Sequence, residues 1–305
     1  MNRRDFLRKS IIAGGLLTVG QFPFQALASE RTHRLVILHT NDVHSRLDPF
    51  PMDGSKLQGL GGISRRAAIV NQIRAKNEHV LLLDAGDIFQ GTPYFNLFDG
   101  EPEFRTMSML KYDAATMGNH DFDNGLDGFF KQLPQANFPF ITSNYNFDDT
   151  LLKDKTLPYK IIQKGAIKIG IIGLGIHLNG LVPAKNFGKT IYLDPVKTAN
   201  ERAAFLKEKK HCDLIICLSH LGYEYPTKQV SDQVVAQHSK YIDIIIGGHT
   251  HTFLDKPTLT SNEVGKNVII NQVGWAGVHL GQITLDFDGS KNYKLANTPN
   301  VILSK

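Results

Sequence analysis

The sequence predicts one α/β domain that runs from about residue 30 to residue 305. Short runs of β-branched and other apolar residues alternate with stretches whose apolar side chains have the spacing of a helix. A repeated strand-then-helix order places helices on the faces of a sheet, which is an α/β sandwich. The sequence has no internal repeat, low-complexity tract or long flexible linker that would divide the chain.

The predicted elements follow one another from residue 35 onward. Buried strands are predicted at residues 35–38, 80–83, 138–141, 167–172, 214–217 and 242–246. Helices are predicted at residues 64–75, 103–110, 126–133, 196–209 and 229–237. The pattern then changes to strands without helices, at residues 268–272 and 282–287, with a turn at Asp288-Gly289.

Composition and charge narrow the class of protein. With 42% hydrophobic and 21% charged residues, the chain resembles an ordinary globular protein. Residues 1–28 supply +3 of the formal net charge of +5, so the rest carries +2, which gives no electrostatic basis for binding nucleic acid. Cys212 and Cys217 are predicted to be buried free thiols, since an extended strand would hold them about 16 Å apart, beyond disulfide reach.

The first 28 residues have the pattern of an export signal. A charged start with Arg3 and Arg4 precedes an apolar stretch at residues 11–19, and Ala26-Leu27-Ala28 has the form of a cleavage site. The paired arginines resemble a bacterial twin-arginine signal, and an ordinary secretory signal is the alternative. We expect export to the periplasm without a stable membrane anchor, because the apolar stretch is too short to span a bilayer.

Side chains of metal-ligand type follow four of these predicted strands and a fifth short apolar strand at residues 114–117. In an α/β sheet, the carboxyl ends of the strands line the ligand-binding crevice, so these five segments are expected to converge on one site. The segments are Asp42-Val43-His44, Asp84-Ala85-Gly86-Asp87, Gly118-Asn119-His120-Asp121, Ser219-His220 and Gly248-His249-Thr250-His251.

These residue types suit a pair of divalent metal ions. Imidazole and carboxylate ligands together favour Mn, Zn, Fe, Co or Ni over Mg or Ca. A single Asp-x-His segment is more often a polar loop, but five of the twelve histidines fall in these strand-end segments. Two ions about 3.5 to 4 Å apart can activate water and stabilise both oxygens of an in-line displacement at phosphorus.

The five segments, in this order, resemble the metal motifs of the calcineurin-like metallophosphoesterase superfamily. The contexts Leu38-His39-Thr40-Asn41-Asp42-Val43-His44 and Asn119-His120-Asp121-Phe122-Asp123-Asn124-Gly125 are similar to the N-terminal catalytic domain of the bacterial 5'-nucleotidase and UDP-sugar hydrolase family. The resemblance implies a four-layer α/β/β/α sandwich. It implies one ion held by Asp42, His44, Asp87 and His251, and another held by Asp87, Asn119, His220 and His249.

The resemblance also implies a catalytic pair. His120 would lie over the substrate phosphate rather than bind metal, and Asp123 would hold it, while a metal-bound hydroxide attacks phosphorus. A carboxylate three residues from an imidazole raises the pKa of the imidazole and favours its protonated form. A plain turn beside Asn124-Gly125 is the alternative reading of Asp123.

Two departures from the family pattern affect the expected metal preference and the expected recognition of the substrate. Some bacterial members have Gln where this chain has His251, so metal preference is expected to differ. The family normally continues into a second domain that binds the nucleotide, whereas this sequence stops at Lys305, so a separate nucleotide-binding chain is an expected partner.

The sequence therefore predicts a phosphomonoesterase of the 5'-nucleotidase type that hydrolyses nucleotides or similar small phosphate esters. The enzymatic alternatives are a 2',3'-cyclic nucleotide phosphodiesterase and a UDP-sugar pyrophosphatase. The non-enzymatic alternative is a binding subunit with a vestigial metal site. Three further residues, His39, His177 and Trp275, are expected to have packing roles or no role in the site.

Overall fold

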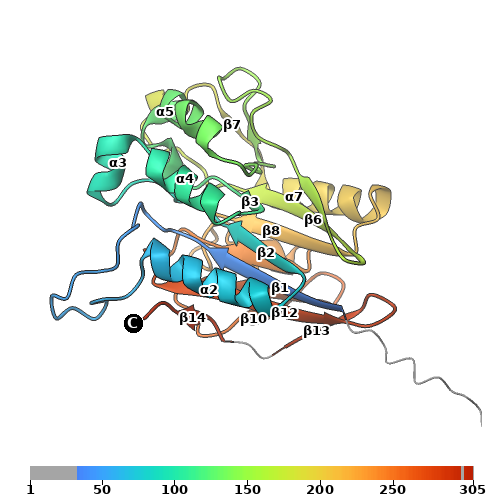
Figure 1. The fold of residues 1–305 in the computed structure, drawn as a ribbon. Helices are drawn as coiled ribbons and strands as arrows, with labels where there is room; N and C mark the ends of the chain where they lie inside the picture. The colour runs from blue at the N-terminus through green and yellow to red at the C-terminus, as the bar shows by residue number, and fades with distance from the viewer. Residues whose placement is uncertain (1–32, 297–298, 305) are drawn as a thin grey trace, which may run out of the picture.

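The computed structural model describes residues 33–296 and 299–304 (Figure 1). The predicted export signal at residues 1–28 lies outside the described residues. The helices are α2 (Ile63–Lys76), α3 (Pro93–Phe98), α4 (Glu101–Met109), α5 (Gly125–Gln132), α6 (Ala184–Phe187), α7 (Pro195–Ala204) and α8 (Asp232–Gln237). Short 3-10 turns lie at His120–Phe122 and Leu133–Gln135, and a π-helical turn lies at Phe205–Lys209.

One six-stranded sheet has the order β13-β12-β1-β2-β3, and β14 also pairs with β12. Its strands are β1 (His33–Thr40), β2 (Val80–Asp84), β3 (Ala114–Ala115), β12 (His279–Phe287), β13 (Tyr293–Leu295) and β14 (Val301–Ile302). The strands β1, β2 and β3 are parallel, whereas β12 is antiparallel to β1. The carboxyl ends of β1, β2 and β3 therefore share one edge of this sheet.

A second six-stranded sheet has the order β10-β11-β9-β8-β6-β5. Its strands are β5 (Lys160–Lys164), β6 (Ile167–Leu174), β8 (Leu214–Ser219), β9 (Ile244–Gly247), β10 (Thr258–Ser261) and β11 (Asn267–Asn271). The inner four strands are parallel, and both edge strands are antiparallel. Two short strands, β4 (Tyr145–Asn146) and β7 (Ile191–Tyr192), pair separately.

Three hydrophobic cores separate four layers, as the resemblance implied. On β1, Leu35 and Ile37 point into the core between the two sheets, while Val36 and Leu38 point to the opposite face. Helices α2, α4 and α5 cover that face, and α2 lies along β1 and β2 in Figure 1. Helices α7 and α8 cover the outer face of the second sheet, against residues such as Ile215. The single-domain, four-layer prediction is confirmed.

The predicted strand at residues 138–141 is wrong. Only isolated bridges occur there, between Ala115 and Phe140 and between Ile141 and Leu157. Pro139 lacks an amide hydrogen and cannot donate to a strand ladder, although its carbonyl still accepts from the amide of Ala115 at 3.1 Å. The remaining predicted strands exist with shifted ends.

The predicted helices also exist with shifted ends, and two of the differences have a local structural cause. Helix α8 begins at Asp232 rather than near residue 229, because the Ser231 side chain caps it by accepting from the Val234 amide. The helix predicted at 196–209 becomes π-helical after Ala204. Cys212 and Cys217 are buried and free, as predicted. Among the described residues, no helix has both the length and the apolarity that crossing a bilayer requires.

Candidate metal centre

The side chains predicted to bind metal come from the carboxyl ends of both sheets. Each follows a parallel strand that ends in the core: β1, β2 and β3 in one sheet and β8 and β9 in the other. Because the sheets pack face to face with these ends on the same side, segments more than 200 residues apart meet, as Asp42 and His249 do. The structure brings together the residues Asp42, His44, Asp87, Asn119, His220, His249 and His251.

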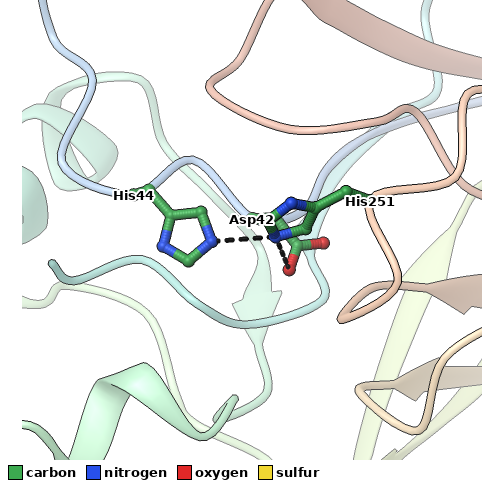
Figure 2. Close-up of side chains that lie close together, drawn as sticks. All are labelled: Asp42, His44 and His251. Carbon is green, nitrogen blue, oxygen red and sulfur yellow. Dashed lines mark hydrogen bonds and ion pairs between the residues drawn. The ribbon is translucent and has the colours of Figure 1, made fainter. Parts of the chain in front are cut away.

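The first cluster consists of Asp42, His44 and His251, whose side chains point toward one another (Figure 2). The Nε2 atoms of His44 and His251 lie 3.0 Å apart, and His251 Nε2 lies 3.4 Å from Asp42 Oδ1. Two imidazole nitrogens and a carboxylate oxygen within 4.8 Å of one another are a set of donors that could hold a metal ion.

The second cluster consists of Asp87, His220 and His249. His220 Nε2 lies 3.1 Å from Asp87 Oδ2, and His249 Nδ1 lies 2.8 Å from Asn119 Oδ1, which adds the amide to this group. Asp87 Oδ2 also lies 3.8 Å from His44 Nε2 in the first cluster. The Asp87 carboxylate therefore sits between the two clusters, where a bridging ligand would sit.

The buried Nε2 atom of His220 supports metal binding at the second cluster. His220 Nε2 is buried and makes no hydrogen bond of acceptable geometry to any described residue, although Nδ1 of the same ring contacts the Ala85 carbonyl at 2.7 Å. A proton on Nδ1 that is donated to this carbonyl leaves the Nε2 lone pair free for a cation. The arrangement of nitrogen and oxygen donors thus fits a divalent transition ion.

The electrostatics of the histidines depend on burial and on Asp87. Burial lowers the pKa of His44 and, with the charge of His220, lowers the pKa of His249 to about 4, so both rings are neutral and able to bind metal at neutral pH. Burial also opposes charge on His220, but the Asp87 carboxylate outweighs it and raises the pKa of His220 to about 10. A cation between these groups would take the place of that proton.

The backbone of the ligand segments is unusual. Asp42, His44, Asp87, His249 and His251 all have left-handed φ angles, between 50° and 73°. Each left-handed residue other than glycine lowers the stability of the fold by about 1 kcal/mol or more, so contacts with the surrounding structure must maintain this backbone conformation. Hydrogen bonds between the segments stabilise this conformation. The amide of Asp42 donates to the Gly86 carbonyl at 2.9 Å, and the amide of His44 donates to the Asp87 carbonyl at 3.0 Å.

Two glycines permit this close approach of the loops. A Cβ on Gly118 would lie 2.2 Å from Asp87 Oδ1, and a Cβ on Gly86 would lie 2.4 Å from the amide nitrogen of Gly118. Gly86 also has a φ of 89°. Gly118 therefore leaves the space that the Asp87 carboxylate occupies, and Gly86 lets the segment after β2 approach the segment after β3.

His120 and Asp123 form a hydrogen-bonded pair at the rim of the centre. His120 Nδ1 lies 2.8 Å from Asp123 Oδ2, and this hydrogen bond raises the pKa of His120. The ring of His120 packs edge-on against that of His44 with centroids 5.2 Å apart, and 36% of the His120 side chain is exposed. The pair is therefore close to the first cluster and accessible to a ligand from solvent.

Sequence reasoning assigned no role to Asp121, which organises the loops. Its buried carboxylate accepts the amides of Asp87, Ile88, Phe89 and Gly118 at 2.8 to 3.2 Å. It thus joins the segment after β2 to the segment after β3. In the sequence, Asp121 stands out only as an acidic residue beside Asn119-His120 with no expected ligand role. Its role as a hydrogen-bond acceptor could not be predicted, because most of its partners lie more than 30 residues earlier in the chain.

Three other residues lie where the sequence placed them, outside the two clusters. His39 is buried with Nε2 2.8 Å from the Asn271 amide nitrogen, and burial lowers its pKa to about 3. His177 is exposed and packs edge-on against Tyr192. Trp275 stacks on the ring of His251 at 5.7 Å, so its packing role includes support of a candidate ligand.

Comparison with known proteins gives the family. The family model described as calcineurin-like phosphoesterase matches residues 35–253. The chain belongs to this family. Among the relatives of this chain, snake venom 5'-nucleotidase of Crotalus adamanteus is 36% identical over 292 residues, covering 89% of this chain and 48% of the relative. The human 5'-nucleotidase is 33% identical over 279 residues, covering 85% and 47%.

Solved structures agree with that assignment. The NAD nucleotidase of Haemophilus influenzae superposes with a TM-score of 0.79 at 30% identity, covering 89% of this chain and 51% of that chain. A 5'-nucleotidase precursor of Thermus thermophilus superposes with a TM-score of 0.77 at 31% identity, covering 88% and 54%. The chain spans about half the length of the relatives that it matches, and resembles their N-terminal domain.

Proposed function

We propose that this chain is a metal-dependent phosphoesterase that hydrolyses phosphate monoesters, nucleotides among them. The observation that carries the proposal is the position of Asp87, whose Oδ2 lies 3.1 Å from His220 Nε2 and 3.8 Å from His44 Nε2. When bound, two divalent ions, of Mn, Zn, Fe, Co or Ni, would supply the positive charge that activates water and stabilises the oxygens on phosphorus. Asp42, His44, Asp87 and His251 would hold one ion, and Asp87, Asn119, His220 and His249 the other.

The remaining residues of the centre have roles that do not involve binding metal. His120, whose pKa is raised by its hydrogen bond to Asp123, would donate a hydrogen bond to the phosphate or a proton to the departing alcohol. The relatives named 5'-nucleotidases support a nucleotide as one substrate. The strained backbone at five ligand residues supports a working centre over a vestigial one, because strain persists where function requires it.

The test is a hydrolysis screen with metal-loaded protein. We expect release of phosphate from AMP, UMP and glycerol phosphate at least tenfold faster than hydrolysis of 2',3'-cyclic AMP or UDP-glucose, in Mn, Zn, Co or Ni. Faster turnover of the cyclic diester or of the diphosphate sugar would favour the corresponding alternative. Absence of hydrolysis in every metal would refute the enzymatic proposal.

A partner chain is the second part of the proposal. Contacts far from phosphorus normally position a substrate and select it. We therefore propose that a separate nucleotide-binding chain supplies recognition of the base. In the same screen, AMP and UMP should differ in kcat/KM by less than about threefold. A difference above about tenfold with this chain alone would contradict the partner.

We also propose that residues 1–28 direct export by the twin-arginine route into the periplasm. The pathway reads the paired arginines, so Arg3→Lys combined with Arg4→Lys should leave the precursor in the cytoplasm. Fractionation of cells that express the full chain would measure this, with Lys9→Arg, which preserves charge outside the pair, as the control. Normal export of the double variant would indicate the general secretory route.

A further inference from the structure

A largely apolar pocket of about 340 Å³ lies between α3 and the segment that follows His44. Its wall includes Leu47, Pro93, Leu97 and Phe98. Leu97 is 73% exposed and Phe98 is 49% exposed, so these side chains leave apolar surface open to solvent. Pockets of roughly 300 to 1,000 Å³ with mostly apolar walls and a few polar groups are typical of small-molecule sites.

The pocket wall begins two residues from a candidate metal ligand. Arg46, in the pocket wall, comes two residues after His44, so the Cα atoms of these two residues are at most about 7.6 Å apart. A tight turn, in which the Arg46 amide donates to the Val43 carbonyl at 3.0 Å, fixes the start of this wall. The opposite wall is tied to the same turn, since the hydroxyl of Thr92 donates to the Ser45 carbonyl at 2.9 Å.

A second path joins the pocket to the metal ligands through aromatic rings. The Arg46 guanidinium lies 4.3 Å over the ring of Phe50, and Phe50 packs edge-on against Trp275 at 5.9 Å. Trp275 in turn stacks on His251, which is 40% exposed. Arg46 therefore belongs both to this row of stacked and edge-on rings and to the pocket wall. The row connects His251 of the first cluster to the pocket.

Charge at the pocket is limited to two side chains. Asp48 accepts a hydrogen bond from the Tyr94 hydroxyl at 2.8 Å at the exposed rim, and Arg46 is the one cationic side chain among the described residues of the pocket wall. If a phosphate ester were held at the metal centre beside His44, its alcohol group would be within reach of this wall, which is apolar apart from Arg46 and Asp48 at its edge.

We propose that this pocket binds the alcohol group of the phosphate ester and makes the enzyme prefer aromatic or other apolar alcohols. The inference rests on the proposed phosphomonoesterase function and names the substrate class within it. Burial of an apolar group in such a pocket changes kcat/KM by about tenfold or more. The pocket residues are specificity-determining and take no part in the chemistry at phosphorus.

The experiment compares 2-phenylethyl phosphate with ethyl phosphate, whose leaving alcohols are similar in acidity. The metal-loaded protein should prefer the phenylethyl ester by about tenfold in kcat/KM. Leu97→Asp and Phe98→Ser should each reduce that preference to about threefold or less, because they remove apolar contacts at exposed positions where folding tolerates a polar residue. Met109→Asp, at an 81% exposed helical position outside the pocket, should keep the preference.

Binding of inert phosphonates separates this inference from the function on which it rests. Calorimetric titration of the zinc-loaded proteins with 2-phenylethylphosphonate and ethylphosphonate should show the same tenfold difference, lost in Leu97→Asp and kept in Met109→Asp. Equal affinity for the two phosphonates, or a difference that Leu97→Asp and Phe98→Ser leave intact, would overturn the pocket assignment. Selective phosphonate binding without hydrolysis of either ester would support the pocket and refute the phosphoesterase proposal.

Discussion

Asp87→Ala should reduce the metal content of the purified protein from about two ions per chain to less than one, and should reduce phosphate release by about a thousandfold or more. The reason is geometric: the Asp87 carboxylate faces His220 in one cluster and His44 in the other, so its loss removes a ligand from both. Elemental analysis after dialysis measures the ions, and release of phosphate from a small monoester measures the activity.

Two matched variants sharpen this expectation. Asp149→Ala removes an exposed carboxylate outside both clusters and should keep both ions and full activity. His251→Ala removes a ligand from the first cluster alone and should cost about one ion. If Asp87→Ala retains two ions, or loses the same number as His251→Ala, then Asp87 does not bridge and the dinuclear proposal is wrong.

His120→Ala should reduce turnover by about a hundredfold or more while both ions remain bound. His120 lies at the rim of the first cluster, it is partly exposed, and its Nδ1 is held by Asp123 at 2.8 Å, which fits a donor to substrate better than a metal ligand. Single-turnover kinetics and metal analysis of the same preparation would separate a loss of chemistry from a loss of metal. His177→Ala, an exposed histidine that packs on Tyr192, is the control and should keep full activity.

The partner of His120 gives a second measure of the same role. Because the hydrogen bond from His120 to Asp123 raises the pKa of His120, the protonated form persists to higher pH in the intact pair. Asp123→Asn removes that effect, so the loss of activity on the alkaline side of the pH profile should begin at lower pH. Full turnover in His120→Ala, or an unshifted profile in Asp123→Asn, would refute the assigned roles.

The sequence by itself determined the α/β class and the residues that could serve as ligands, while the four-layer arrangement was implied by the family resemblance. The first two follow from local pattern: apolar runs alternate with stretches of helical spacing, and a residue of metal-ligand type follows the parallel strands β1, β2, β3, β8 and β9. Those regularities depend only on neighbours along the chain. The failed strand at residues 138–141 marks the limit of this reasoning, because apolar character predicted burial there but Pro139 breaks the ladder.

Only the tertiary structure decided how the candidate ligands group and what supports them. His44 faces His251, more than 200 residues later, because the two sheets pack with their carboxyl ends together. Asp121 binds amides of the preceding loop, and the left-handed backbone at the ligands is held by hydrogen bonds between loops. The pocket beside Arg46 likewise has walls from two separate segments. Contacts of this kind depend on how distant segments pack, and local periodicity carries no information about that packing.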